Sequence, residues 1–525
     1  QTHLVFPIKA KGNSLVVAMT NPLDLFALED LRFATKMRLE IAVASQRDIL
    51  DAIERYHALG ELEMDVNSLG SIEEGVEIIK QEEAEEKNIE DLKSLSELPP
   101  VVRLINSIIA DAIKIEASDI HIEPQKYAVI IRFRVDGIMR EVLKTNRHIH
   151  SSLVSRIKVV SNMDISIRRK PQDGRCQVLY RNKNYDLRVS TIPVTYGEKV
   201  TMRILDQERA GIRLEDLGMS ENNFRKFSEA IKKPQGLILV TGPTGSGKSS
   251  TLYACLNRLN SPSVNIITVE DPVEFDIAGI NQVQINPQAG ITFAAGLRSI
   301  LRQDPDIVMV GEIRDSETAS IAFQAGQTGH LVLSTLHTND ASSAVTRLMD
   351  LGIPSFLVSA SLISVVGQRL VRKICRRCKG ADPLTPQVLK ELSAHMDIDE
   401  KMTFWKGAGC EACQYTGYSG RLGIFEILTL TPSLKEMIQS NVSAVALKKA
   451  AARDGYQSMT LEGIKKALEG LTTIEEVYRV APPEDEEIFR DQFESSEQVM
   501  IDASLIRPSA ASFSSVKPKK ILVAD

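Results

Sequence analysis

The chain has 525 residues, of which 43% are hydrophobic and 25% are charged, and its formal net charge is −6. This length corresponds to roughly three to four domains, and the composition excludes fibrous and low-complexity proteins. Because only 5% of the residues are aromatic and acids outnumber bases, a surface that wraps nucleic acid is not expected. No apolar run reaches the roughly 18 residues that a membrane span needs. These features indicate a multidomain protein of the soluble, intracellular kind.

The first part of the chain divides into two segments. Residues 1–57 combine short apolar runs with a stretch of helical periodicity, and we interpret them as part of an N-terminal α/β domain. Residues 58–97 carry a dense run of acids and predict a linker. Because the sequence begins at Gln1 rather than at a methionine, and stops inside a strand-like run, we expect a fragment of a longer chain.

Residues 98–211 predict a small α+β domain. A helix with apolar residues on one face follows Pro99 and Pro100, and short runs with strand-like alternation come after it. The pair Asp136-Gly137 lies between two such runs and predicts a tight hairpin.

Between residues 212 and 480, predicted strands alternate with predicted helices, a pattern typical of a mostly parallel sheet. An apolar strand leads directly into a glycine-rich loop of the form G-x-x-x-x-G-K-S, followed by a helix. In such a loop the backbone N–H groups surround the phosphates of a nucleotide, Lys248 neutralises their charge, and the hydroxyl of Ser249 holds Mg²⁺. The predicted nucleotide-binding residues are Gly242, Pro243, Thr244, Gly245, Ser246, Gly247, Lys248, Ser249 and Ser250. We therefore predict that the chain binds ATP and Mg²⁺.

Three further apolar strands end in polar residues. One ends at Glu312, and we predict that this strand lies adjacent to the phosphate loop, where its carboxylate manages metal-bound or attacking water. A second ends at Glu270, a candidate to position or deprotonate the attacking water; the alternative is a solvated strand end. The third is followed by His337, placed where a γ-phosphate is sensed.

Two C-x-x-C pairs, 31 residues apart, predict a metal site. Each pair places two sulfurs on one side of an ion, so Cys375, Cys378, Cys410 and Cys413 match a structural zinc site with four thiolates. The alternative is two disulfides or four free thiols. The basic stretch 368–379 surrounds the first pair, and we interpret it as a solvated face or a docking surface.

These motifs together resemble the secretion ATPase superfamily. The segments that resemble its Walker A motif, Asp box, Walker B motif and His box are Gly242–Ser249, Glu270–Glu274, Glu312 and residues 329–338. The cysteine pairs and the segments 117–124 and 171–175 resemble the GspE/PilB branch, the ATPases of type II secretion and type IV pilus assembly. The resemblance covers about residues 98–480.

The resemblance implies a RecA-like P-loop ATPase core of the α/β class. A small PAS-like α+β domain and a partial N-terminal domain precede this core, and a zinc module at 370–420 is inserted in it. It also implies a homo-hexamer with ATP between the small domain and the core. Arg188 and Arg203 correspond to the family's arginine fingers, and we expect a neighbouring subunit to supply them. The alternative is that these arginines pair with surface acids.

The leading function is a ring motor that hydrolyses ATP to assemble pilins or pseudopilins. The resemblance implies an inner-membrane platform partner and a cytoplasmic-domain partner, which would hold a cytoplasmic ring at the inner membrane. Two alternatives stay open: a nucleotide-gated regulatory module, and a motor for DNA uptake or conjugation. Residues 481–518 predict a second linker, and residues 519–525 resemble the first strand of a receiver domain.

Overall fold

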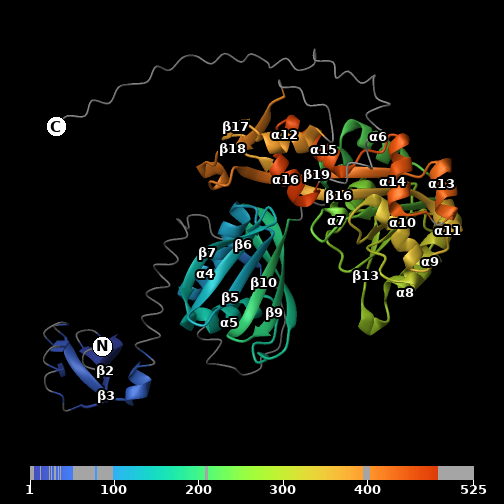
Figure 1. Ribbon diagram of the computed structural model, residues 1–525. Helices are drawn as coiled ribbons and strands as arrows, with labels where there is room; N and C mark the ends of the chain where they lie inside the picture. Colours follow the sequence, from blue (N-terminus) through green and yellow to red (C-terminus); the bar gives the residue numbers. More distant parts are fainter. Residues whose placement is uncertain are drawn as a thin grey trace, which may run out of the picture.

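The computed structural model describes most of residues 5–52, strand 77–79, and residues 99–206, 211–393, 402–440 and 442–482. Figure 1 shows an N-terminal sheet, a central sheet and a larger C-terminal part. Nearly all of the linker predicted at 481–518, and the strand predicted at 519–525, lie outside the described residues. None of the helices in this described part is both long and apolar enough to cross a membrane.

The N-terminal region is a three-stranded sheet. β1 (Val5–Lys11) pairs antiparallel with β2 (Ser14–Met19), and β2 pairs parallel with β3 (Arg38–Val43). The last three residues of β2 are buried, so the apolar run seen in the sequence forms the core strand of this region.

The central region is a seven-stranded antiparallel sheet in the order β4-β8-β9-β10-β5-β6-β7. Its strands are β4 (Glu77–Ile79), β5 (Asp119–Pro124), β6 (Ala128–Val135), β7 (Ile138–Asn146), β8 (Gln172–Tyr180), β9 (Lys183–Val194) and β10 (Gly197–Asp206). α4 (Pro99–Lys114) and α5 (His150–Val160) join the apolar residues of the sheet in one core. The helices therefore cover one face, and the alternate residues of each strand are directed to the other face.

The short strand β4 is an element that the sequence analysis did not predict. It lies within the segment 58–97, which we predicted as a linker, yet it pairs antiparallel with β8 at the edge of the sheet. The charge of this segment masked a strand of only three residues.

The hairpin predicted at Asp136-Gly137 is confirmed between β6 and β7. Its two turn residues have φ angles of 50° and 84°. A two-residue type I′ turn needs positive φ at both positions, which Asp tolerates and Gly adopts freely.

The C-terminal region is built on a mixed sheet in the order β13-β12-β14-β15-β11-β16-β19. Its strands are β11 (Gly236–Thr241), β12 (Ile266–Glu270), β13 (Asn281–Gln284), β14 (Ile307–Val310), β15 (Leu331–Leu336), β16 (Leu362–Ile374) and β19 (Tyr418–Thr429). Every neighbouring pair is parallel except β16 and β19. The carboxyl ends of the parallel strands therefore meet at one edge, where ligands bind in such sheets.

Helices cover both faces of this mixed sheet. α6 (Glu221–Ala230) and α7 (Lys248–Leu259) share an apolar cluster with Ile238 and Val240 of β11, whereas Leu237 and Leu239 belong to a second cluster. The helices of the second cluster are α8 (Phe293–Ile300), α9 (Ser316–Gln327), α10 (Ala341–Asp350), α11 (Ser355–Ser361), α13 (Pro432–Gln439) and α14 (Ala444–Arg453). A strand buried on both faces is a continuous apolar run, which explains the pattern in the sequence.

The strand order corrects one prediction. The strand that ends before Glu312 is β14, and β15 separates it from β11, so it is not adjacent to the strand that carries the phosphate loop. Chain order did not reveal that β15 is inserted between them.

The cysteine-rich segment lies at the far end of β16 and β19 (Figure 1). β17 (Lys379–Asp382) pairs with β18 (Phe404–Gly407) between the two cysteine pairs. The remaining helices of this part are α12 (Pro386–Ser393), α15 (Met459–Leu468) and α16 (Ile474–Val480), and the short 3₁₀ helices of the described chain are η1 (Arg147–Ile149), η3 (Leu214–Leu217), η4 (Pro287–Ala289) and η5 (Glu411–Cys413).

Candidate active site and metal centre

The phosphate loop connects β11 to α7, in the strand-to-helix setting predicted from the sequence. Gly242, Gly245 and Gly247 have positive φ angles of 148°, 79° and 89°. A Cβ atom at Gly242 would lie 2.4 Å from the carbonyl oxygen of Gln368. Only glycine fits this close approach, and it lets successive N–H groups turn toward a bound anion.

The polar groups of the loop fit a nucleotide triphosphate. Lys248 Nζ donates to the carbonyl oxygens of Gly242 at 2.9 Å and Pro243 at 3.0 Å, which hold the ammonium over the loop. Ser246 Oγ is buried and has no hydrogen-bond partner within the described part of the chain. Ser249 is exposed in the first turn of α7, and Ser250 beside it is partly exposed. Thr244 and Gly245 are exposed in the loop that precedes the helix. A buried hydroxyl without a partner, next to a lysine and a helix N-terminus, is a suitable donor to phosphate.

Gln368 supports the phosphate loop from β16, a role that the sequence analysis did not find. Its side chain is nearly inaccessible, and its Oε1 accepts a hydrogen bond of 2.7 Å from Thr251 Oγ1 on α7. Its Nε2 lies so close to Gly247 that a Cβ there would approach it to 2.8 Å. Gln368 therefore fixes α7 and the loop against the neighbouring strand.

Glu312 follows β14 and faces this site. Its carboxylate pairs with Arg314 and lies 3.3 Å from Nε2 of His337. Burial lowers the pKa of Lys248, and the negative charge of Glu312 opposes this shift, so the acid and the lysine interact across the site. The structure thus brings together three residues that we predicted separately.

Glu270 lies in a different environment from the one predicted. Its Oε1 accepts hydrogen bonds from Thr268 Oγ1 at 2.5 Å and Gln282 Nε2 at 3.1 Å, and its Oε2 accepts one from the Tyr253 hydroxyl at 2.5 Å. Only 4% of Glu270 is exposed, so it is not a solvated strand end. Because both oxygens are engaged, this conformation does not leave the carboxylate free to take a proton from water. The Tyr253 hydroxyl in turn accepts the N–H of Glu274 at 3.0 Å, which ties the following loop to Glu270.

Arg188 and Arg203 are opposite each other on β9 and β10. Arg188 reaches the loop after β12 of its own chain: Nη1 lies 2.8 Å from Glu274 Oε2, and Nη2 donates to the carbonyl oxygen of Val273 at 2.5 Å. Arg203 pairs with Asp119 of its own sheet at 3.0 Å; this acid is buried and is not one of the surface acids of the alternative interpretation. Both arginines line a cavity of about 440 Å³. The small domain therefore contacts the loop after β12 within one chain. That a neighbouring subunit supplies these arginines stays a prediction.

The two histidines that flank β15 differ in environment. His330 Nδ1 lies 3.0 Å from the carbonyl oxygen of Ala325 at the end of α9, which is a structural contact. His337 is half exposed and faces Glu312. The next residue, Thr338, lies with its Oγ1 2.5 Å from Oγ1 of Thr241, at the end of β11. His337 is thereby connected to the strand that carries the phosphate loop.

The basic stretch 368–379 is not one solvated face. Arg369 Nη2 donates to the carbonyl oxygen of Asn339 at 3.0 Å, and burial lowers the pKa of this guanidinium. Arg372 pairs with Glu476 at 2.5 Å and lies 3.9 Å from the ring centre of Tyr418. Neither arginine is a freely solvated cation, because each is held by these contacts. The exposed cations of the stretch are Lys373, Arg376, Arg377 and Lys379.

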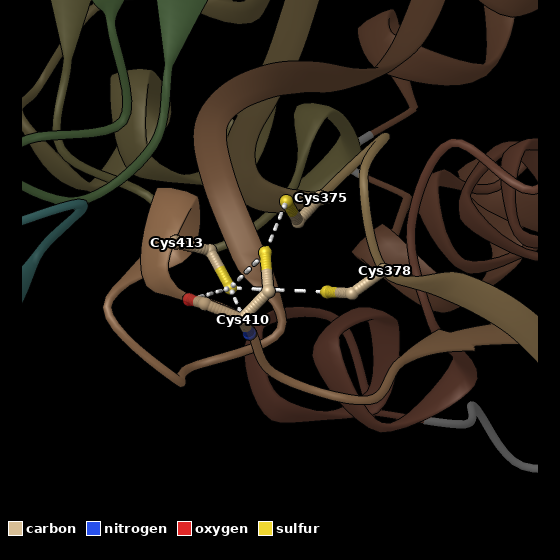
Figure 2. A group of neighbouring side chains, drawn as sticks. All are labelled: Cys375, Cys378, Cys410 and Cys413. Carbon is tan, nitrogen blue, oxygen red and sulfur yellow. Dashed lines mark hydrogen bonds between the residues drawn. The ribbon is translucent and has the colours of Figure 1, made fainter. Parts of the chain in front are cut away.

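The four predicted cysteine ligands converge on one point, as Figure 2 shows. Their sulfur atoms all lie within 4.8 Å of one another, and none forms a disulfide. Burial alone would raise the pKa of Cys413, but the N–H groups of Cys410 at 3.2 Å and Gly417 at 3.3 Å lower it to about 6. Four converging sulfurs with N–H donors that favour the thiolate fit a structural zinc site.

Comparison with protein families agrees with this geometry. The family described as "Type II/IV secretion system protein" matches residues 94–479. The chain belongs to this family. In addition, the MshEN domain model matches residues 1–61, which includes the N-terminal segment that we predicted as a separate domain.

Relatives in this family are secretion and pilus ATPases. The type IV pilus assembly ATPase PilB of Myxococcus xanthus is 45% identical over 486 residues, covering 92% of this chain and 85% of the relative. The type II secretion system protein E of Aeromonas hydrophila is 51% identical over 391 residues, covering 74% and 77%. The type II secretion system ATPase E of Vibrio cholerae is 50% identical over 391 residues, again covering 74% and 77%. The chain is therefore an ATPase.

Solved structures agree on the fold. The pilus retraction motor PilT with bound ADP is 26% identical, with a TM-score of 0.51, and covers 72% of this chain and 97% of its own. The ATPase DotB of Legionella pneumophila has a TM-score of 0.54 at 21% identity, covering 72% and 94%, a likeness of fold alone. The α/β class with mixed sheets is thus confirmed.

Proposed function

We propose that this ATPase drives the assembly of pilins or pseudopilins, in type IV pilus assembly or type II secretion. The observation that carries the proposal is that the small-domain residue Arg188 contacts the loop after β12, on the same mixed sheet that carries the phosphate loop and Glu312. A site shared between two domains couples hydrolysis to domain movement, which is what a motor needs. The names of the relatives support both systems equally.

In the proposed reaction, water attacks the γ-phosphate of ATP. Lys248 and the loop N–H groups bind the phosphates, Ser249 holds Mg²⁺, and Glu312 orients the water, with His337 next to it as the γ-phosphate sensor. Mg²⁺, when bound, neutralises charge on the phosphate oxygens. The guanidinium groups of Arg188 and Arg203 stabilise the negative charge of the transition state. Glu270 acts as a positioning residue through Tyr253 and the loop that follows.

We also propose the organisation of the whole motor. Residues 212–480 form a RecA-like core with the zinc module at 370–420, and residues 98–211 form a PAS-like domain, whose strands β5 and β10 are neighbours at the centre of the sheet. Six copies form a ring. An inner-membrane platform protein and a cytoplasmic-domain partner hold this ring at the cytoplasmic face of the membrane.

The test measures MgATP turnover by the full chain at a series of protein concentrations. Lys248→Ala and Arg188→Ala are each expected to reduce turnover by about 100-fold or more. Arg213→Ala is the matched control, because this exposed arginine pairs with Asp216, three residues along its own chain. An equimolar mixture of the two inactive variants then distinguishes the arrangements. Because Arg188 contacts its own chain, we expect the mixture to stay inactive, whereas recovery would show that a neighbour supplies the arginine.

Two outcomes would replace the proposal. Bound ATP without turnover at any concentration would indicate a nucleotide-gated module. Turnover that rises on addition of DNA would indicate a nucleic-acid motor.

A further inference from the structure

The knuckle around the second cysteine pair contacts the small domain. We define the knuckle as residues 410–421, which include η5, the following turn and the start of β19. Arg140 of β7 donates from Nη1 to Oε1 of Gln414 at 2.9 Å. Asp136, at the tip of the β6–β7 hairpin, accepts the N–H of Gly420 at 3.0 Å through Oδ2. Its Oδ1 lies 3.7 Å from Nε of Arg421.

These polar contacts join segments far apart in the chain, and one of them, between Asp136 and Arg421, pairs opposite charges. The carboxylate of Asp136 is mostly buried by the contact, with 16% of its side chain exposed. Between the two surfaces remains a cavity of about 300 Å³, lined on one side by residues 114–116 and on the other by the knuckle. A contact made of a few polar groups holds two domains together and still allows their relative position to change.

The cysteines determine the shape of the knuckle. The N–H of Tyr415 donates to the carbonyl oxygen of Cys410 at 2.9 Å, and the N–H of Gly417 donates to Cys413 Sγ at 3.3 Å. Gln414 and Tyr415 both have positive φ, at 50° and 60°. This conformation is uncommon for residues other than glycine, and the hydrogen bonds to Cys410 and Cys413 hold the turn that carries Gln414 in it.

We propose that the knuckle is the docking surface for the small domain of the same chain, and that zinc at the four cysteines keeps it in the docking shape. The proposal rests on the zinc site put forward above. Without the ion, the metal–sulfur bonds that hold the two cysteine pairs together are absent, and the turn that carries Gln414 loses this support. Zinc then acts on the contact between two domains rather than on the chemistry of ATP.

The experiment follows hydrogen exchange of the full chain with zinc bound, after removal by a chelator, and after zinc is added back. Removal is expected to accelerate exchange about tenfold at the hairpin, residues 134–141, as well as in the knuckle, and added zinc is expected to reverse this. Acceleration confined to the knuckle would overturn the proposal. MgATP binding and zinc content are measured on the same samples, so that failure of the nucleotide site or of the zinc site is seen separately.

Variants separate docking from folding of the module. Asp136→Gly keeps the hairpin, because glycine adopts the positive φ at this position, and removes the carboxylate; it is combined with Arg140→Ala. This double variant is expected to keep one zinc per chain and to lose the response of the hairpin to zinc removal. Lys144→Ala, an exposed cation on the same strand, is the control and should respond as the unaltered chain does. A hairpin that still responds fully in the double variant would show that zinc acts without this contact.

Discussion

Two neighbouring strand ends of the mixed sheet, at Glu270 on β12 and at Glu312 after β14, have the same sequence pattern and opposite environments. Both are acids at the end of an apolar strand. Glu270 is buried with both oxygens engaged by neutral donors, whereas Glu312 faces His337 and the lysine of the phosphate loop. The difference shows that the side chains contributed by adjacent elements, and not the acid itself, decide whether a carboxylate positions the site or faces the substrate.

The largest effect is expected for Glu312→Gln. Loss of the carboxylate that faces the phosphates should lower turnover by about 100-fold or more, with little change in melting temperature or in MgATP binding. Steady-state turnover and equilibrium nucleotide binding are measured separately, so that a loss of turnover is distinguished from a loss of binding. The matched control is Glu317→Gln, an exposed acid paired with Arg298 on the neighbouring helix. Normal turnover in Glu312→Gln would contradict the proposed role of this carboxylate in hydrolysis.

Glu270→Gln is expected to act mainly on stability. The amide offers an N–H₂ group to a site that contains three donors, so one buried hydrogen bond is lost and another group is left unsatisfied, at about 2–3 kcal/mol. Denaturant unfolding measures this loss, and Tyr253→Phe should reproduce part of it. Full stability together with abolished turnover would instead make Glu270 the proton acceptor.

A third acid, Glu476, shows what changes when the donors to a buried carboxylate are charged. Glu476 is buried like Glu270, but side-chain hydrogen bonds from Arg372 and Arg479 overcome the opposing effect of burial and lower its pKa from 4.5 to about 2. A depressed pKa contributes stability above pH 4.5 that is lost as the pH falls from 4.5 to 2. The contribution is about 2 kcal/mol after allowance for the half-exposed Arg479. As the pH is lowered from 4.5 to 2, the free energy of unfolding should decrease more for the unaltered chain than for Glu476→Gln.

The smallest effect is expected for a hydrogen bond between two uncharged side chains that support the phosphate loop. Thr251→Val removes the hydroxyl that donates to Gln368 and keeps the shape of the side chain. Losing this buried hydrogen bond costs about 1 kcal/mol, so we expect the KM for MgATP to rise about fivefold with kcat little changed. A fall in kcat with unchanged KM would place Gln368 in the chemical step.

The predictions that depended on contiguous residues hold in the structure. The phosphate loop, the hairpin and each cysteine pair are encoded within a few residues, because glycine φ preferences and ligand spacing act locally. The features that the sequence analysis missed depend on pairing between distant segments. They include the insertion of β15 next to β11, the engagement of Glu270 by Tyr253, and the support of the loop by Gln368. No spacing along the chain specifies which strand becomes a neighbour, and the basic stretch 368–379 was therefore interpreted as surface.

β16 runs for 13 residues from the sheet to the cysteine site, with Gln368 against the phosphate loop and Cys375 directly after its last residue. At about 3.3 Å per residue, these two positions are roughly 23 Å apart along one extended strand. The antiparallel ladder to β19 accompanies β16 over nearly its whole length. A pull along this ribbon loads its hydrogen bonds together, in shear, and does not open them one at a time. The ribbon therefore links the segment beside the phosphate loop to the cysteine site through paired strands and not through a loop.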